Sequence, residues 1–264
     1  MGGSGGDGAR GGAGGDVWET AARGGFAVSG ALHLAIGFLI VRIGLGANAE
    51  ADQSAVLASV GDRALGTVVL WLAAIAFVAL ALWQLADAVR GRETAERLKS
   101  AAKAVMYGAL AFTSASIAMG SGGSNSDQQA QGFAGQVMQA PAGRALVGAI
   151  GLAIIAGAVY HVHKGATTKF LEDLRPLPSG PVGTGIRWLG VAGYVAKGIA
   201  LGVVGLLFAY AALTADPQKA KGIDGGVEWL LGAPGGPVIV VLVGLGFAAY
   251  GCYSLARARY ARMR

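Results

Sequence analysis

Residues 65–86 read LGTVVLWLAAIAFVALALWQLA, a stretch without a single charged side chain. A helix rises 1.5 Å per residue, so about 20 apolar residues cross the roughly 30 Å of hydrocarbon in a bilayer. A chain segment surrounded by lipid must satisfy its own backbone hydrogen bonds, which a lone helix does and a lone strand does not. This stretch therefore predicts a transmembrane helix.

The composition of the whole chain favours the same environment. Hydrophobic residues make up 54% of the 264 residues, charged residues only 14%, and the mean hydropathy is +0.54. Soluble domains carry about 25% charged residues, so this chain has too few charges to cover a globular surface. Five further apolar stretches are predicted as spans: residues 24–45, 101–119, 145–162, 188–213 and 238–256. The stretch 101–119 is the weakest, because it carries Lys103 near its start and several hydroxyl side chains.

The distribution of lysine and arginine predicts how the chain is oriented. Fifteen of them lie on one side of the predicted spans: Arg10, Arg23, Arg90, Arg92, Arg97, Lys99, Lys103, Lys164, Lys169, Arg175, Arg187, Arg257, Arg259, Arg262 and Arg264. Five lie on the other side: Arg42, Arg63, Arg144, Lys219 and Lys221. Basic residues accumulate in cytoplasmic loops, so we expect a multi-pass protein of the plasma (inner) membrane with both termini in the cytoplasm.

The six stretches form three copies of a two-helix unit. The letters GFAVSG at residues 25–30 return as GYVAKG at residues 193–198. In the second helix of each copy, Gly66, Gly143 and Gly236 precede an aromatic residue by the same interval. We predict a disordered glycine-rich tail over residues 1–20 and repeats at 21–92, 97–168 and 187–260. Repeats of two spans share one orientation, which predicts an all-α bundle with pseudo-threefold symmetry about the membrane normal.

These features resemble one known family. The glycine–aromatic–basic–glycine opening at residues 193–198, the pair Asp52-Gln53 and the aromatic residues that end the second helices are similar to the domain-of-unknown-function 1206 family of bacterial membrane proteins. The resemblance covers roughly residues 20–260, although Ser29 stands where a basic residue is expected. It implies an integral membrane protein and supplies no established activity, so no functional residue is carried over.

Three polar residues inside the spans form a candidate intramembrane site: His33, Tyr107 and Lys197. Tyr107 holds in the second repeat the position that His33 holds in the first. A charge near the centre of a span costs at least about 2.5–3.5 kcal/mol, so Lys197 either reaches the lipid phosphates or belongs to a buried ion or proton site. His33 either hydrogen-bonds a neighbouring helix or relays protons, since imidazole titrates near pH 6.5.

Basic side chains at the cytoplasmic helix ends are candidates for contacts with anionic lipid headgroups. They are Arg90, Arg92, Lys164, Lys169, Arg257 and Arg259. Two histidines at one of these ends, His161 and His163, lie two residues apart and so on different faces of a helix, which argues against a metal site. We predict no nucleic-acid partner, because the basic residues lie in membrane loops, and no cofactor or metal, because the sequence contains no motif for either.

The leading functional prediction is a non-enzymatic scaffold or accessory component of the bacterial envelope. Its expected partners are the lipid bilayer, anionic lipids included, and another membrane protein or a second copy of the chain. The alternative is a small transporter or channel with a polar site on the pseudo-threefold axis. An enzyme is the least favoured class, because no convergent set of catalytic side chains is visible.

Overall fold

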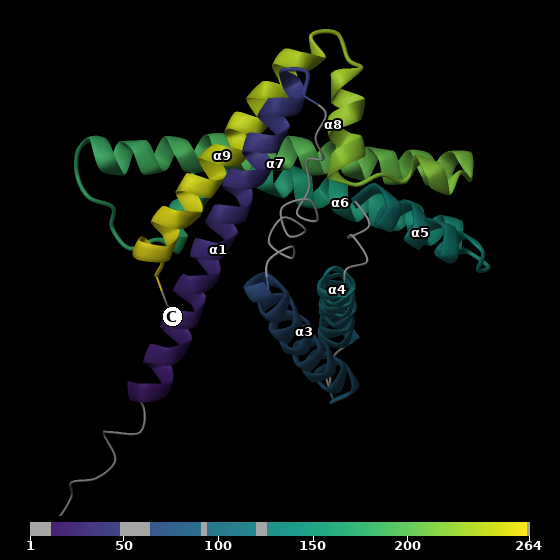
Figure 1. Cartoon of the computed structure of the whole chain (residues 1–264), viewed down its shortest axis with the longest axis horizontal. Helices are drawn as coiled ribbons and strands as arrows, with labels where there is room; N and C mark the ends of the chain where they lie inside the picture. Colours follow the sequence, from purple (N-terminus) through teal and green to yellow (C-terminus); the bar gives the residue numbers. More distant parts are fainter. Residues whose placement is uncertain (1–11, 48–63, 91–93, 120–125, 263–264) are drawn as a thin grey trace, which may run out of the picture. The chain divides into compact units, whose positions relative to one another are not determined.

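The computed structural model describes residues 12–47, 64–90, 94–119 and 126–262 (Figure 1). Within these ranges the regular structure is helical, apart from an isolated bridge between Leu174 and Ala261. In chain order the helices are α1 (Gly12–Gly44), α3 (Ala64–Arg90), α4 (Thr94–Ala118), α5 (Ser126–Met138), α6 (Gly143–Ala166), η1 (Lys169–Asp173), α7 (Pro181–Thr214), η2 (Pro217–Lys219), α8 (Ile223–Leu231) and α9 (Gly236–Tyr260).

Five of the described helices are long and apolar enough to cross a membrane. The apolar segments are Arg23–Gly44, Leu70–Val89, Gly143–Ala166, Pro181–Thr214 and Gly236–Tyr260. They match five of the six predicted spans, so the chain is a multi-pass membrane protein. Large side chains on their outer faces are exposed, among them Leu152, Leu206 and Leu242, as expected for faces that contact lipid.

The structure does not confirm two parts of the sequence prediction, the span at residues 101–119 and the disordered tail. The stretch 101–119 lies in α4, which forms a helix of 25 residues but is less apolar than the other five. Its crossing of the membrane stays a prediction. The segment predicted as a tail contains the start of α1 at Gly12, and residues 1–11 lie outside the described residues.

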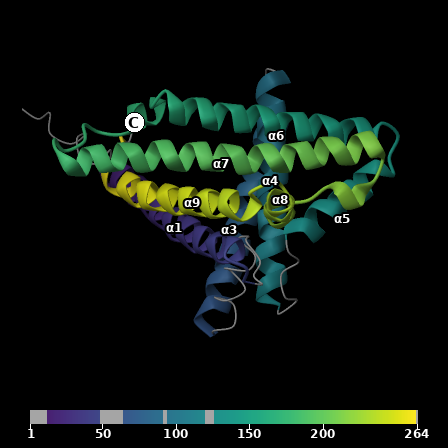
Figure 2. The same cartoon turned by 90° about the horizontal axis from the view of Figure 1, so that it is seen from above.

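The chain divides into two compact units. Unit 1 comprises Met1–Asp52 and Ser126–Arg264, and unit 2 comprises Gln53–Asn125. In unit 1, α1 lies beside α9, α9 packs on α7, and α7 lies beside α6 (Figures 1 and 2). In unit 2, α3 packs on α4. In all three side-by-side pairs, the first helix of one repeat contacts the second helix of another.

Glycines at seven-residue spacing close the seam between α1 and α9. A Cβ on Gly37 would lie 2.7 Å from the carbonyl oxygen of Gly244, and a Cβ on Gly244 would lie 2.8 Å from that of Gly37. One heptad away, Gly30 and Gly251 meet in the same way, with 2.9 and 2.8 Å to the partner's carbonyl oxygen. The two backbones therefore touch directly, which small residues allow in membrane helices.

The seam between α6 and α7 repeats this arrangement at the equivalent positions. A Cβ on Gly151 would lie 2.9 Å from the carbonyl oxygen of Gly205, and the reverse distance is also 2.9 Å. Gly205 corresponds to Gly37 in the repeat alignment, and Gly151 corresponds to Gly244. In unit 2 the equivalent residues are Ala74 of α3 and Ala111 of α4, and both are buried. Small residues thus occupy the equivalent positions of all three helix pairs.

Arginines at equivalent positions hydrogen-bond across the ends of two of these pairs. Arg23 donates to the carbonyl oxygen of Ala258 at 3.1 Å, which ties the start of the membrane segment of α1 to the end of α9. Arg97 donates to the carbonyl oxygen of Ala88 at 3.1 Å, at the equivalent place between α4 and α3. The last carbonyls of a helix lack partners within the helix, so a guanidinium at this place satisfies them.

Candidate functional site

The structure brings two of the three predicted site residues into contact inside unit 1. His33 of α1 and Lys197 of α7 approach each other, with 3.2 Å between the imidazole Nε2 and the ammonium Nζ. His33 is only 7% exposed. Both residues lie within helices that are apolar enough to span the membrane. Lys197 therefore turns toward a neighbouring helix at this level of the bundle.

The hydrogen bonds of His33 assign its tautomer. Nδ1 lies 2.8 Å from the backbone carbonyl oxygen of Ser29, which can only accept, so Nδ1 carries the proton. Nε2 of the neutral ring then has a free lone pair, to which the ammonium of Lys197 donates a hydrogen bond. Both ring nitrogens are satisfied without any group outside the protein.

Aromatic residues of α9 complete the surroundings of this contact. The Nζ of Lys197 lies 4.6 Å from the ring centroid of Tyr250, a distance at which the ring face attracts a cation. The ring of His33 lies 4.7 Å from that of Tyr250 and 6.0 Å from that of Phe247. Among the ion pairs of the described residues, none involves Lys197. An imidazole and an aromatic ring thus stabilise a cation for which the described residues provide no carboxylate.

The sequence prediction did not include Tyr250 or Phe247. The only signal for them is their spacing of three residues, which places both rings on one face of α9. The approach of α9 to α7 depends on Gly193, where a Cβ would lie 2.5 Å from the Cα of Tyr250. Such a contact between residues far apart in the chain has no signature in local sequence.

Tyr107, the third predicted member of the site, lies on α4 of unit 2. Its ring stacks on that of Phe77 of α3, with 6.3 Å between the centroids and 19° between the planes. The described contacts of Tyr107 are therefore those of the α3–α4 seam.

The residues predicted to bind lipid headgroups differ in their surroundings. Asp173 of η1 accepts from Lys164 at 2.7 Å and lies 3.5 Å from Arg257, so both basic side chains turn toward this carboxylate. Lys169 and Arg259 are exposed. Arg90 is the last residue of α3, and Arg92 lies outside the described residues.

The segment between α6 and α7 anchors this charged cluster through Phe170. Its side chain is fully buried against the rings of Tyr194 and Tyr253, with centroid distances of 5.3 and 5.1 Å. The amide of Arg175 donates to the carbonyl oxygen of Tyr260 at 2.7 Å, which joins the segment to the end of α9. His161 and His163 are nearby in sequence, but no group of three or more His, Cys, Asp or Glu side chains close enough to hold a metal occurs among the described residues.

Comparison with known proteins identifies the family. The family model described as Domain of Unknown Function (DUF1206) matches the chain three times, at residues 24–91, 98–168 and 192–261. The chain belongs to the DUF1206 family. Three matches in one DUF1206 chain confirm the predicted threefold repetition. The chain is also similar to an uncharacterized protein, YxxB of Bacillus subtilis strain 168, with 24% identity over 248 residues, which cover 90% of each protein. No solved structure matches the chain.

Proposed function

We propose that this DUF1206 protein is a non-enzymatic scaffold or accessory component of the plasma membrane. The observation that carries the proposal is the closure of the helix seams at Gly37–Gly244 and Gly151–Gly205, where backbone touches backbone. Helices in such contact are held in one register, because sliding one along the other would bring side chains into collision with backbone, and moving them apart would lose the packing between them. A rigid apolar body with exposed basic residues such as Lys169 and Arg259 fits a component that organises other membrane molecules.

The experiment is purification of the tagged chain from its own membranes in mild detergent, followed by reconstitution. We expect a stable complex with another membrane protein or a second copy, binding to vesicles that contain anionic lipid, and no ion flux above that of empty vesicles. A protein that purifies as a monomer without partners and does not bind vesicles with anionic lipid would contradict the proposal. A protein-dependent ion flux would contradict it as well.

A second candidate function, a small transporter or channel, is favoured by the contact between His33 and Lys197. A charged side chain at membrane depth is rare and commonly marks an ion or proton pathway. Here the cation lies 3.2 Å from a side chain that can itself take up a proton. The current to measure is one of chloride or protons, because the described surroundings of the Lys197 ammonium contain no carboxylate that would bind a metal cation.

Replacing Lys197 with methionine and His33 with leucine separates the two candidates. For a scaffold we expect no flux in any variant, and we expect the lysine replacement to be better tolerated. Methionine removes a charge that costs about 2.5–3.5 kcal/mol in the membrane, whereas leucine at position 33 leaves the ammonium without its acceptor. Melting temperature in detergent and dye-reported proton and chloride flux are the measurements. A flux in the parent protein that disappears in folded Lys197→Met would establish transport instead.

We further propose that the six predicted spans form a pseudo-threefold bundle with both termini in the cytoplasm. Support comes from the three equivalent helix pairs and from the fifteen basic residues on one side against five on the other. In a Cys252→Ser background, Lys169→Cys should react with an impermeant maleimide only after the cells are opened, and Lys219→Cys should react in intact cells. The reverse pattern would show that the topology is inverted. Labelling of both residues from one side would show that the segment between them does not cross the membrane.

A further inference from the structure

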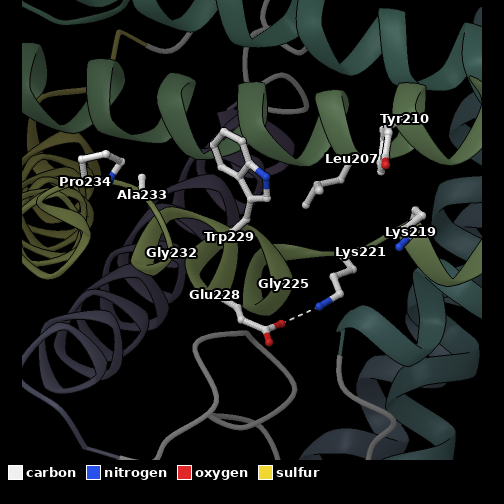
Figure 3. Close-up of a pocket in the computed structure, with 10 residues that line it drawn as sticks. All are labelled: Leu207, Tyr210, Lys219, Lys221, Gly225, Glu228, Trp229, Gly232, Ala233 and Pro234. Carbon is white, nitrogen blue, oxygen red and sulfur yellow. Dashed lines mark hydrogen bonds and ion pairs between the residues drawn. The ribbon is translucent and has the colours of Figure 1, made fainter.

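A pocket of about 700 Å³ lies at the C-terminal end of α7 (Figure 3), and neither His33 nor Lys197 is among its lining residues. Its apolar wall consists of Leu207 and Tyr210 of α7 and Trp229 of α8. Lys221 and Glu228 form an ion pair on its rim, and Lys219 of η2 lies beside them (Figure 3). The volume is in the range of ligand-binding clefts, and the combination of an apolar wall with a few charged groups is typical of them.

A second, apolar groove of about 520 Å³ continues from this pocket along α7. It shares Leu207, Tyr210 and Trp229 with the pocket and is otherwise lined by aliphatic residues of α7 such as Leu206 and Leu213. Leu206 and Leu213 are 54% and 75% exposed, so the groove lies on the outer face of a helix that is apolar enough to span the membrane. The two hollows together therefore form one site with a polar end and an apolar end.

The residues that line the polar end carry charges of both signs: two lysines, Lys219 and Lys221, and one carboxylate, Glu228. Lys221 pairs with Glu228, and Lys219 lies 3.9 Å from Asp216. An ammonium has three donors and a carboxylate about four acceptor positions, so each partner of the Lys221–Glu228 pair can bind a further group. A headgroup with only a negative charge would leave the carboxylate of Glu228 without a cation to bind. A headgroup with a phosphate and an ammonium can form an interaction with each charge of the pair.

We propose that this site binds one phospholipid whose headgroup carries a phosphate and a primary ammonium. The phosphate accepts from Lys221 and Lys219, the ammonium donates to Glu228, and one acyl chain lies in the apolar groove of α7. Tyr210 and Trp229 lie at the junction, where amphipathic rings are favoured at the level of the headgroups. The proposal rests on the membrane placement in the proposed function and adds a specific ligand to it.

Native mass spectrometry of the delipidated full-length protein tests the proposal. The probes are phosphatidylethanolamine, phosphatidylcholine and phosphatidylglycerol with identical acyl chains. We expect phosphatidylethanolamine to bind tightest, because the quaternary ammonium of phosphatidylcholine cannot donate to Glu228 and phosphatidylglycerol brings no cation. Equal binding of the three lipids, or tightest binding of phosphatidylglycerol, would overturn the assignment.

Two variants and a matched control assign the binding to this pocket. Glu228→Gln should bind phosphatidylethanolamine about tenfold more weakly and lose its preference over phosphatidylglycerol, because one charge-assisted hydrogen bond is lost. Lys221→Met should weaken all three lipids by a similar factor, and Glu172→Gln, at an exposed carboxylate of η1 outside the pocket, should change nothing. If Glu228→Gln binds like the parent while circular dichroism shows it folded, the proposal is wrong.

Fluorescence quenching gives a second measurement that does not depend on the charge variants. Phosphatidylethanolamine brominated near the start of its acyl chain should quench a variant that retains Trp229 as its single tryptophan more than one that retains Trp188, at the other end of α7. Equal quenching of both would mean bulk lipid and overturn the proposal. Failure of these tests in a protein that still inserts into membranes and forms its complex would contradict the lipid site alone, and leave the proposed function standing.

Discussion

Replacing Gly37 with leucine is expected to lower the free energy of unfolding by about 3 kcal/mol or more, because it forces α1 away from α9. A Cβ at this position would lie 2.6 Å from the backbone nitrogen of Ala248 and 2.7 Å from the carbonyl oxygen of Gly244. Both are backbone atoms, so neither can rotate away as a side chain would. The helices must separate along the seam, and the contacts at Gly30 and Gly251 are lost with it. Thermal unfolding in detergent, followed by circular dichroism, measures the effect.

Gly157→Leu in α6 is the matched control. A Cβ on Gly157 meets nothing within 4 Å, so leucine there projects into open space on the helix surface. Leucine also has the higher helix propensity, by about 0.8–1 kcal/mol, so the melting temperature should stay the same or rise. Gly205→Leu, at the equivalent seam position in α7, should match Gly37→Leu. Equal melting temperatures for Gly37→Leu and Gly157→Leu would show that the seam does not hold the protein together.

Replacing Phe170 with alanine is expected to cost about 3–5 kcal/mol, the usual range for a buried phenylalanine. The ring is fully buried in the aromatic cluster with Tyr194 and Tyr253, and a Cβ on Gly190 would lie 2.3 Å from it. Its removal leaves a cavity that these rigid helices cannot close. The segment that holds Asp173 should then detach from α7 and α9, which releases Lys164 and Arg257 from their carboxylate.

Limited proteolysis between α6 and α7, together with the melting temperature, measures this prediction. Phe112→Ala is the control, since its side chain is 73% exposed and its loss opens no cavity. We expect trypsin to cleave Phe170→Ala after Lys169 under conditions that leave the parent and the control intact. Resistance to cleavage together with an unchanged melting temperature would mean that Phe170 does not anchor the segment.

The helices and the repetition could be predicted from the sequence because both depend on patterns within short segments of the chain. An apolar run such as residues 65–86 needs no partner to be recognised, and the equal spacing from Gly66, Gly143 and Gly236 to an aromatic residue is visible in one chain. Neither pattern indicates which helices pair. Each first helix packs on the second helix of another repeat, α1 on α9 included, so the order in space differs from the order in the chain.

The candidate site was only partly accessible to prediction for the same reason. His33 and Lys197 could be predicted as site residues because polar residues are rare in apolar runs. Their partner Tyr250 did not, because an aromatic residue in a span is unremarkable until the fold places it over a cation. The two interpretations of Lys197, reaching the lipid phosphates or belonging to a buried ion or proton site, depend on the direction of a flexible side chain, and local sequence does not determine that direction.

Hydrophobicity and repetition are properties of short segments, so they could be read from the chain as three similar repeats of membrane helices. The packed fold was needed to show that Gly37 faces Gly244, that Lys197 donates to His33, and that Trp229 and the Lys221–Glu228 pair line one pocket. Such contacts join residues far apart in the chain, and they depend on how closely two helix backbones approach, a quantity that becomes defined only when the helices are packed.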